Sequence, residues 1–465
     1  MSQVGTVSNP LRVAIIGSGP AGFYAAEHLH RRKDLVVEID MFDRLPTPFG
    51  LVRAGVAPDH QKIKSVTKVF DKIAARPGFR FFGYVDLGQD LSVADLRQFY
   101  HQIVYTTGAQ TDRPLGIPGQ DLPGSHPATE FVAWYNGHPD FRNCQFDLSQ
   151  ERVAVVGIGN VAVDVARILC RTPEELAQTD IADYALEALR HSRVKEVIML
   201  GRRGPAQAAF TAPEVKELGE MADADVLVPP GEAQLDELSQ ATLAAADRDV
   251  LRTVELIQEY AHRQPLGKSR RLTLRFLVSP VELMGDEQGH VTAMRIVKNK
   301  LYATEAGTLR PKATNEYETL PVGLVFRSIG YKGVPLPGVP FNDSWGVIQN
   351  EKGRVIDVQT QQSVVGEYTA GWIKRGPSGV IGTNKPDAAE TVDCMVQDLA
   401  KGSHLNPPQP TAAAAEQFIR HCQPNYFSYA DWLRLDELEI ARGQAIGRPR
   451  LKFTSVEEML VALGK

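Results

Sequence analysis

Two glycine-rich turns in the sequence have the spacing that binds a dinucleotide pyrophosphate. In the first, Gly17, Gly19 and Gly22 follow an apolar run at 12–16 and open a helical pattern. The first glycine permits a tight turn, the second lets backbone amides approach the pyrophosphate, and the third lets the helix pack closely on the strand. Asp43 ends a second apolar run, where an acid accepts hydrogen bonds from ribose hydroxyls. These residues predict a nucleotide site on a strand–turn–helix unit.

The second turn, residues 157–162 (GIGNVA), has alanine in place of the third glycine, which the fingerprint allows. The strand expected next, 194–200, ends without an acid, and Arg202 and Arg203 follow it. An acid at that place would repel a 2′-phosphate, whereas guanidinium groups bind one through charge-assisted hydrogen bonds. The second turn therefore predicts NADP rather than NAD.

Composition and charge exclude several classes of protein. The chain has 465 residues, 43% of them hydrophobic, and a formal charge of −5. This is an ordinary globular composition with no indication of nucleic-acid binding. No apolar run approaches the ~18 residues of a membrane span, and no basic region precedes an apolar core at the amino terminus. We therefore expect a cytoplasmic protein without membrane insertion.

The four cysteines give no sign of a redox or metal centre. Cys144, Cys170, Cys394 and Cys422 lie far apart and form no CxxC pair. Neither an iron–sulfur cluster nor a zinc ribbon has ligands at the right spacing, and a dithiol centre is missing. We expect buried or surface thiols and no metal.

A proline- and glycine-rich segment, residues 46–60, lies between the fingerprints. It is too apolar for a loose loop, so we expect it to pack against a ring system. Asp59 is expected to cap a helix whose apolar stripe continues to Ile73. His60 then lies in the first helical turn, where the helix dipole disfavours imidazolium, so we expect a neutral His60 at pH 7.

Further along the chain, residues 231–262 are predicted to be mostly helical and 320–329 to form one strand. The basic run from His262 to Arg275 is most simply a solvated strand and loop, and steering of an acidic partner is the alternative. Three helices are predicted after residue 410, without a chemical motif.

Together these patterns predict an α/β fold with two Rossmann-like dinucleotide-binding domains. The first domain is discontinuous because the second is inserted into it. We predict boundaries at 1–108 and 331–465 for the two parts of the first domain, the latter with the C-terminal helices. The inserted domain is predicted at 109–330.

The chain resembles the adrenodoxin reductase-type ferredoxin–NADP reductases, most closely their bacterial members, over nearly its whole length. Many flavoproteins share residues 17–22, whereas the matching stretches 48–60 and 371–385 are long and specific. Asp43 departs from the usual glutamate of this family and is one methylene shorter. The matching stretches are residues 17–22, 48–60, 159–164, 201–205 with 209–211, and 371–385.

The resemblance implies that NADPH gives a hydride to FAD, and that single electrons then pass to a ferredoxin-type iron–sulfur protein. His60 and Asp164 resemble the catalytic pair near the nicotinamide and the flavin. The implied FAD contacts are Gly17, Gly19, Ala21, Gly22, Asp43, Leu51, Val85, Trp372, Gly379, Val380 and Ile381. The implied NADP contacts are Ile158, Gly159, Asn160, Val161, Arg202, Arg203, Glu214 and Gly379.

Two alternatives remain beside this interpretation. One is another two-nucleotide flavoenzyme, such as an NADPH-dependent monooxygenase or a diaphorase; a monooxygenase would not be expected to carry the stretch 56–60. The other is a non-catalytic nucleotide-binding protein, although such a protein needs only one fingerprint. A disulfide reductase would need the missing CxxC pair.

Overall fold

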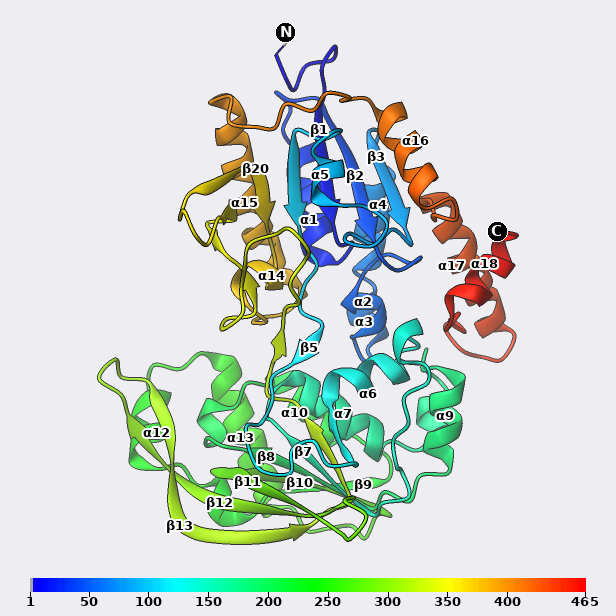
Figure 1. The fold of residues 1–465 in the computed structure, drawn as a ribbon. Coiled ribbons are helices and arrows are strands. Elements are labelled where there is room, and N and C mark those ends of the chain that lie inside the picture. Colours follow the sequence, from blue (N-terminus) through cyan, green and yellow to red (C-terminus); the bar gives the residue numbers. More distant parts are fainter. Residues whose placement is uncertain (1–2) are drawn as a thin grey trace.

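Two open sheets, each with helices packed on it, organise the molecule (Figure 1). The computed structural model describes residues 3–465. The upper sheet of Figure 1 is seven-stranded and mostly parallel. In order across the sheet its strands are β18 (Asn350–Glu351), β19 (Arg354–Ile356), β20 (Ser363–Thr369), β4 (Gln102–Tyr105), β1 (Leu11–Ile16), β2 (Val37–Asp43) and β3 (Phe79–Gly83).

Strand β1 lies inside the sheet between β4 and β2. Every one of its residues is buried, as expected for a parallel strand covered on both faces. One face of the sheet packs on α1 (Pro20–His30), α4 (Thr67–Ala74), α15 (Asn384–Ala400), α17 (Tyr429–Gln444) and α18 (Val456–Leu463). The other face packs on α5 (Val93–Leu96) and α16 (Ala412–Cys422). The chain leaves β1 for β2 on one side and later returns to β4 on the other side, which makes the carboxyl end of β1 a topological switch point.

The lower sheet is six-stranded, and every strand pair in it is parallel. Its strands, in order, are β6 (Ser125–Pro127), β14 (Leu324–Arg327), β7 (Arg152–Val156), β8 (Glu196–Gly201), β10 (Arg270–Phe276) and β9 (Ala224–Leu227). The switch point here lies between β7 and β14.

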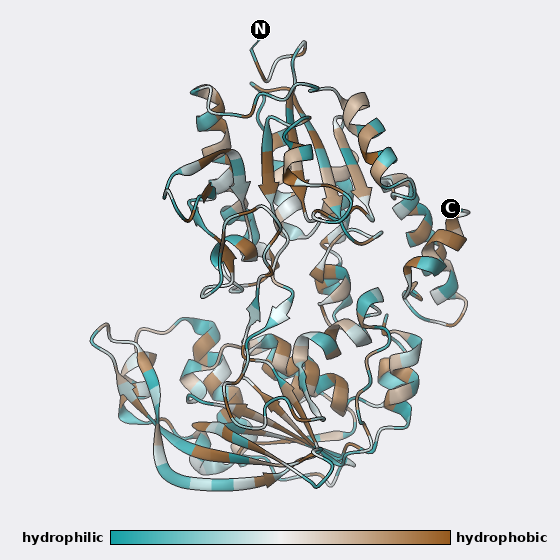
Figure 2. Ribbon diagram, viewed as in Figure 1, coloured by the Kyte–Doolittle hydropathy of each residue, from teal (hydrophilic) through white to brown (hydrophobic). Residues whose placement is uncertain are grey.

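The two faces of the lower sheet are covered differently. Helices α6 (Ala128–Tyr135), α7 (Asn160–Cys170), α9 (Asp183–Arg190), α10 (Ala212–Leu218) and α13 (Arg248–His262) pack on one face. An antiparallel sheet of β11 (Val278–Gly285), β12 (Val291–Ala303) and β13 (Leu309–Pro321) packs on the other. Figure 2 shows apolar residues concentrated in the strands of the two large sheets, whereas the outer strand β13 is mostly hydrophilic.

Short elements complete the chain. The two crossings between the sheets pair with each other as β5 (Thr111–Asp112) and β15 (Tyr331–Lys332). The remaining elements are α2 (Leu51–Ala54), α3 (Gln61–Lys64), η1 (Pro139–Phe141), α8 (Pro173–Leu176), η2 (Pro205–Gln207), α11 (Pro230–Ala233), α12 (Glu237–Leu243), β16 (Phe341–Asn342), β17 (Val347–Ile348), α14 (Trp372–Arg375) and η3 (Ile381–Thr383). Among residues 3–465, no helix is long and apolar enough to cross a membrane.

The two dinucleotide-binding folds and the three C-terminal helices predicted from the sequence are confirmed. The strands of the upper sheet come from residues 11–105 and 350–369, and those of the lower sheet from 125–327. The domain boundaries at 108 and 330 stay a prediction.

Two predicted elements are wrong. The helix expected after Asp59 is broken into α3 and α4 around Ser65, whose hydroxyl donates to the carbonyl of Lys62 and competes with the helical pattern. The strand expected at 320–329 is two strands in different sheets, because the chain passes from β13 to β14 at Gly323. Apolar runs alone do not show a change of sheet.

The last segment of the chain ties the two folds together. Lys452 is 5% exposed and lies 3.3 Å from Asp180 of the inserted fold. Lys64, at the end of α3, donates to both carboxylate oxygens of Asp180 at 2.7 and 2.8 Å. Burial alone would raise the pKa of Asp180, but the two ammonium groups outweigh it and hold this pKa below its usual range. Asp180 is thus a buried anion between two segments of the upper fold.

We predict that Asp180→Asn lowers stability by about 3 kcal/mol, because removal of one partner leaves a buried ammonium uncompensated. The folded pKa lies below the unfolded value, so this contribution is present above pH of about 4 and is lost as the pH falls. Urea unfolding followed by circular dichroism measures the change. The control is Glu187→Gln, which removes an exposed ion pair and should change stability by less than about 0.5 kcal/mol. Equal midpoints for the two variants would contradict the assignment.

Candidate functional site

The first glycine turn joins β1 to α1 with the geometry that the fingerprint requires. Gly17 has φ +104°, and a Cβ added there would lie 2.7 Å from the carbonyl oxygen of Thr106. At Gly19 the backbone is extended, and no atom lies within 4 Å of an added Cβ. Asp43 faces this turn and accepts from the amide and hydroxyl of Ser18 at 3.0 and 2.5 Å. The turn therefore has open space above it and an oriented carboxylate beside it.

The second turn joins β7 to α7 in the same way. Gly157 has φ +139°, and Gly159 again has no atom within 4 Å of an added Cβ. Asn160 accepts from the amide of Thr211 at 2.9 Å, which fixes the segment before α10 beside the turn. Ile158, Gly159, Asn160 and Val161 are all partly accessible.

Two guanidinium groups stand after β8. Arg202 is exposed and Arg203 partly so, and neither side chain has a hydrogen bond or ion pair within residues 3–465. Burial, with the neighbouring charge of Arg202, lowers the pKa of Arg203. Two adjacent cations without a carboxylate are a site for an anionic group such as a phosphate.

The segment 371–381 returns to the first turn. Gly371 lies so close to Ala21 that an added Cβ would be 2.5 Å from the alanine methyl. Trp372 is partly accessible, donates from Nε1 to the carbonyl of Ser378 at 3.1 Å, and lies 5.5 Å from the ring of Tyr331. Residues 379 and 380 are exposed and Ile381 is partly exposed, so their amides are open to a ligand.

Two other predicted FAD contacts differ in accessibility. Leu51 opens α2 and is partly accessible. Val85 is 2% exposed with its side chain in the core, and its amide donates to the carbonyl of Asp43 at 2.9 Å. The side chain of Val85 is therefore not open to a ligand, and its amide already has a partner.

Unpartnered polar atoms at this edge of the upper sheet fit a bound dinucleotide. The hydroxyl of Thr107, directly after β4, and Nε of Arg375, in α14, are buried without a hydrogen bond among the described residues. On the inserted fold, the hydroxyl of Tyr135 in α6 is also buried without a hydrogen bond among the described residues. Buried polar atoms normally have partners. Together with the open space at Gly19, these atoms indicate that a ligand belongs here.

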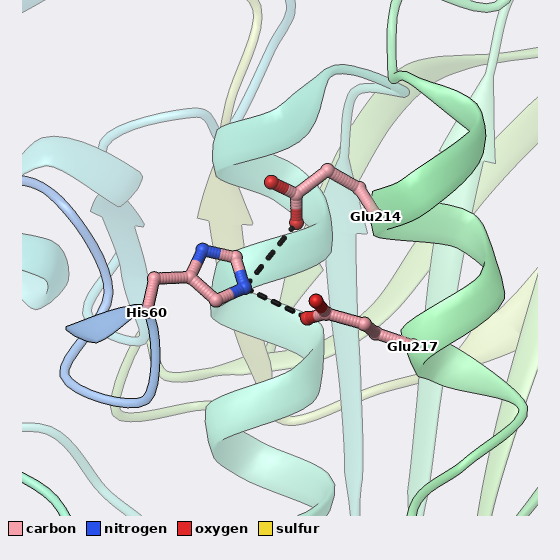
Figure 3. A group of neighbouring side chains, drawn as sticks. All are labelled: His60, Glu214 and Glu217. Carbon is pink, nitrogen blue, oxygen red and sulfur yellow. Dashed lines mark hydrogen bonds and ion pairs between the residues drawn. The ribbon is translucent and has the colours of Figure 1, made fainter. Parts of the chain in front are cut away.

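A charged cluster lies between the two folds. His60, directly before α3, is 8% exposed, and its Nε2 lies 2.7 Å from Glu217 and 3.7 Å from Glu214 (Figure 3). Its Nδ1 lies 3.9 Å from Asp164 on α7. The two glutamates are one turn apart on α10, so both carboxylates face the imidazole. The cluster thus brings the predicted pair His60 and Asp164 together with Glu214.

Arg167 holds this cluster in place. Its guanidinium is fully buried and lies 2.6 Å from Asp59, 2.7 Å from Asp164 and 3.2 Å from Glu214. Asp59 also pairs with Arg171 at 2.8 Å. Burial alone would raise the pKa of Asp59, but the two arginines lower it to about 2. Asp59 is therefore a permanent anion and does not cap a helix, which corrects the sequence expectation.

The helix start does not lower the pKa of His60, contrary to the reasoning from the sequence. Burial acts to lower the pKa of His60, but the hydrogen bond to Glu217 and the charges of Glu214 and Asp164 outweigh it, so the pKa is raised. For Asp164, burial acts in the opposite direction and raises the pKa to about 7. Helix α3 has only four residues, so its dipole is small beside three carboxyl groups.

The sequence analysis missed Arg167 and Glu217. A signal was present, because Asp164 and Arg167 are one turn apart on a helix that must be buried against a sheet, and Glu214 and Glu217 repeat that spacing. The basic run after residue 262 does not form a free patch. Arg263, Arg271 and Arg275 each pair with glutamates, and the side chains of Lys268 and Arg270 donate to backbone carbonyls.

Two dinucleotide-binding folds that face each other across a titratable cluster define a pyridine-nucleotide oxidoreductase. Residues 11–199 match the family described as "Pyridine nucleotide-disulphide oxidoreductase". The chain is 45% identical to the NADPH-ferredoxin reductase FprA of Mycobacterium tuberculosis, over 98% of this chain and 100% of that protein. It is 41% identical to the human mitochondrial NADPH:adrenodoxin oxidoreductase, over 97% and 92% of the two chains.

The solved structures agree. The structure of Mycobacterium tuberculosis FprA in complex with NADPH superposes with a TM-score of 0.93 at 45% identity, covering 98% of this chain and 100% of that one. The chain belongs to the family of NADPH-ferredoxin and NADPH:adrenodoxin reductases.

We predict that Gly19→Ala removes dinucleotide binding at the first turn without harming the fold. The backbone at Gly19 suits alanine and the protein leaves space for the methyl group, but that space is where a pyrophosphate approaches. The affinity of the first fold should fall at least tenfold, or about 1.4 kcal/mol, with little change in the stability of the ligand-free protein. Cofactor content after purification and equilibrium dialysis measure the effect.

The matched control is Gly17→Ala, which should lower the stability of the ligand-free protein itself. Its positive φ and the contact with Thr106 disfavour any side chain. Undiminished dinucleotide content in Gly19→Ala would contradict the assignment of the turn.

Proposed function

We propose that the protein is an NADPH:ferredoxin oxidoreductase that holds FAD at the first turn and NADP at the second. The observation that carries the proposal is the difference between the two turns. Asp43 faces the first turn, and the unpaired Arg202 and Arg203 follow the strand beside the second. An acid suits the ribose hydroxyls of FAD, whereas two guanidinium groups suit the 2′-phosphate that distinguishes NADPH from NADH.

The proposed FAD site includes the open turn at Gly19, the exposed amides of residues 379–381 and the indole of Trp372. Bound FAD supplies the conversion of a two-electron hydride into single electrons. The proposed NADP site includes the turn at 158–161 and the two arginines. In this arrangement His60 and Glu214 would hold the nicotinamide end of NADPH near the flavin.

The cluster around His60 would position the nucleotide and hold protons near the reacting rings. His60 shares a proton with Glu217 at 2.7 Å, and the carboxyl of Asp164 has a pKa of about 7. Asp164 can therefore take up or release a proton near neutral pH, and the raised pKa of His60 favours the protonated imidazole. Arg167 keeps their side chains fixed because it pairs with carboxylates from both folds. We propose His60 and Asp164 as the catalytic pair on this basis.

The electron acceptor is proposed to be a ferredoxin-type iron–sulfur protein. The relatives described above are named for ferredoxin and adrenodoxin as partners, and they match this chain over almost its whole length. All four cysteines are free and far apart in the sequence, so the described chain offers no dithiol to receive the electrons. A cytoplasmic location remains a prediction.

An anaerobic titration of the FAD-loaded protein with NADPH tests the proposal. We expect one equivalent of NADPH to bleach the flavin, because one hydride reduces one flavin. Mixing the reduced protein with an oxidised ferredoxin should then reduce two ferredoxin molecules per NADPH consumed. Absorbance of the flavin and of the iron–sulfur cluster reports the two steps separately.

A preparation that takes up no FAD would overturn the proposal. Reduction of the flavin by NADPH without transfer to any ferredoxin, but with turnover of oxygen and an organic substrate, would favour a monooxygenase instead.

We predict that Arg202→Ala and Arg203→Ala each raise the KM for NADPH about tenfold or more, and leave the KM for NADH nearly unchanged. A charge-assisted hydrogen bond to a phosphate contributes about 1.5–3 kcal/mol, and NADH lacks that phosphate. Steady-state kinetics with both nucleotides measure the ratio.

The control for these variants is Arg190→Ala, since Arg190 is half exposed on α9 and pairs with Glu187. Its KM values for both nucleotides should stay at the wild-type level. Equal increases of the KM for NADPH and for NADH in the Arg202 and Arg203 variants would show that these side chains do not bind the 2′-phosphate.

A further inference from the structure

Three side chains from the two folds converge on one point between them. Figure 3 shows His60 directed at Glu214 and Glu217, which project from successive turns of α10. One ligand atom from each of the three residues lies within 4.8 Å of the other two. His60 and Glu217 are 157 residues apart in the sequence, so only the folded chain forms this group.

The donor set suits a divalent ion of the zinc type. One imidazole nitrogen and two carboxylate oxygens are typical ligands of an open zinc site, which keeps a fourth position for water. With bonds of 2.0–2.2 Å, the ligand atoms around a tetrahedral ion are roughly 3.3–3.5 Å apart. Nε2 of His60 lies 3.7 Å from Glu214, close to this spacing, and 2.7 Å from Glu217. The second distance reflects a shared proton, and the side chain of Glu217, 38% exposed, has room to move outward.

The charges around the group also favour a cation. Arg167 contacts four carboxyl groups, and Arg171 contacts Asp59 and Glu175. Carboxyl groups thus outnumber guanidinium groups among the described residues of the cluster, so a divalent ion adds positive charge where acidic groups are in excess. Because Arg167 already neutralises part of the cluster, we expect weaker binding than at a structural zinc site.

We propose that His60, Glu214 and Glu217 form an inhibitory site for a divalent transition-metal ion, best matched by Zn²⁺. The ion replaces the proton shared by His60 and Glu217, so binding releases that proton to solvent. The inhibition rests on the proposed function, in which His60 and Glu214 lie beside the nicotinamide. An ion held by these two residues then occupies the place of the nicotinamide end of NADPH.

Zn²⁺ is the suitable probe because it is redox-inert and oxidises neither NADPH nor a reduced flavin. Calorimetric titration of the FAD-loaded protein with ZnCl₂ should show one ion per chain. Glu217→Gln and His60→Gln should each weaken binding at least tenfold. X-ray absorption of the bound ion should show only nitrogen and oxygen ligands at about 2.0–2.2 Å, which distinguishes this site from the cysteines.

The chain offers a matched control. His191 and Glu187 form another histidine–glutamate pair at 2.9 Å, exposed on α9 and without a third ligand among residues 3–465. His191→Gln should bind Zn²⁺ as the wild type does. Unchanged affinity in both Glu217→Gln and His60→Gln, loss of binding in His191→Gln, or sulfur ligands in the absorption spectrum would each overturn the metal site.

Kinetics test the inhibitory part separately. Zn²⁺ should raise the KM for NADPH and leave kcat unchanged, and Glu217→Gln should require at least tenfold more Zn²⁺ for the same effect, relative to its own uninhibited rate. Zn²⁺ bound at the site without any effect on the KM for NADPH would overturn the inhibition and the placement of the nicotinamide beside His60. Failure of the calorimetric titration alone would leave the reductase function, tested by the NADPH titration, intact.

Discussion

The buried guanidinium of Arg167 is the interaction on which the relative placement of the two folds depends. It belongs to the inserted fold, yet it makes its shortest contact with Asp59, which belongs to the upper fold. A guanidinium without solvent is strongly destabilising unless carboxylates surround it. Separation of the folds would remove Asp59 and leave that charge incompletely paired. The same contact fixes the turn that carries His60, because Asp59 and His60 are adjacent in the chain.

This way of joining the folds also determines the chemistry between them. Several carboxyl groups gather around one buried cation, and burial raises the pKa of one of them, Asp164, to about 7 although Arg167 acts to lower it. A structural ion pair and a proton-holding site are therefore the same set of side chains. Asp180 contrasts with this cluster, because two lysines surround one acid and its pKa is lowered.

The sequence predicted what local patterns encode. Both glycine turns depend on residues close together in the chain. The direction of the pKa shift of His60 was missed because its neighbours Glu214 and Glu217 are remote in sequence and approach only in the folded chain. Apolar periodicity shows which residues are buried, but not which element or sheet they pack against. For this reason the break between α3 and α4 and the change of sheet at Gly323 were missed.

The order of strands in the upper sheet has a consequence for biosynthesis. Strand β4 pairs on one side with β1 and on the other with β20, and the whole inserted fold lies between β4 and β20 in the chain. During synthesis the inserted fold is therefore complete while the upper sheet still lacks β18, β19 and β20 on one side of β4. The lysine that reaches Asp180 from the far end, Lys452, leaves the ribosome later still. The upper fold is thus the first to begin and the last to be completed. Until β20 is synthesised, the unpaired edge of β4 must be kept from pairing with other strands.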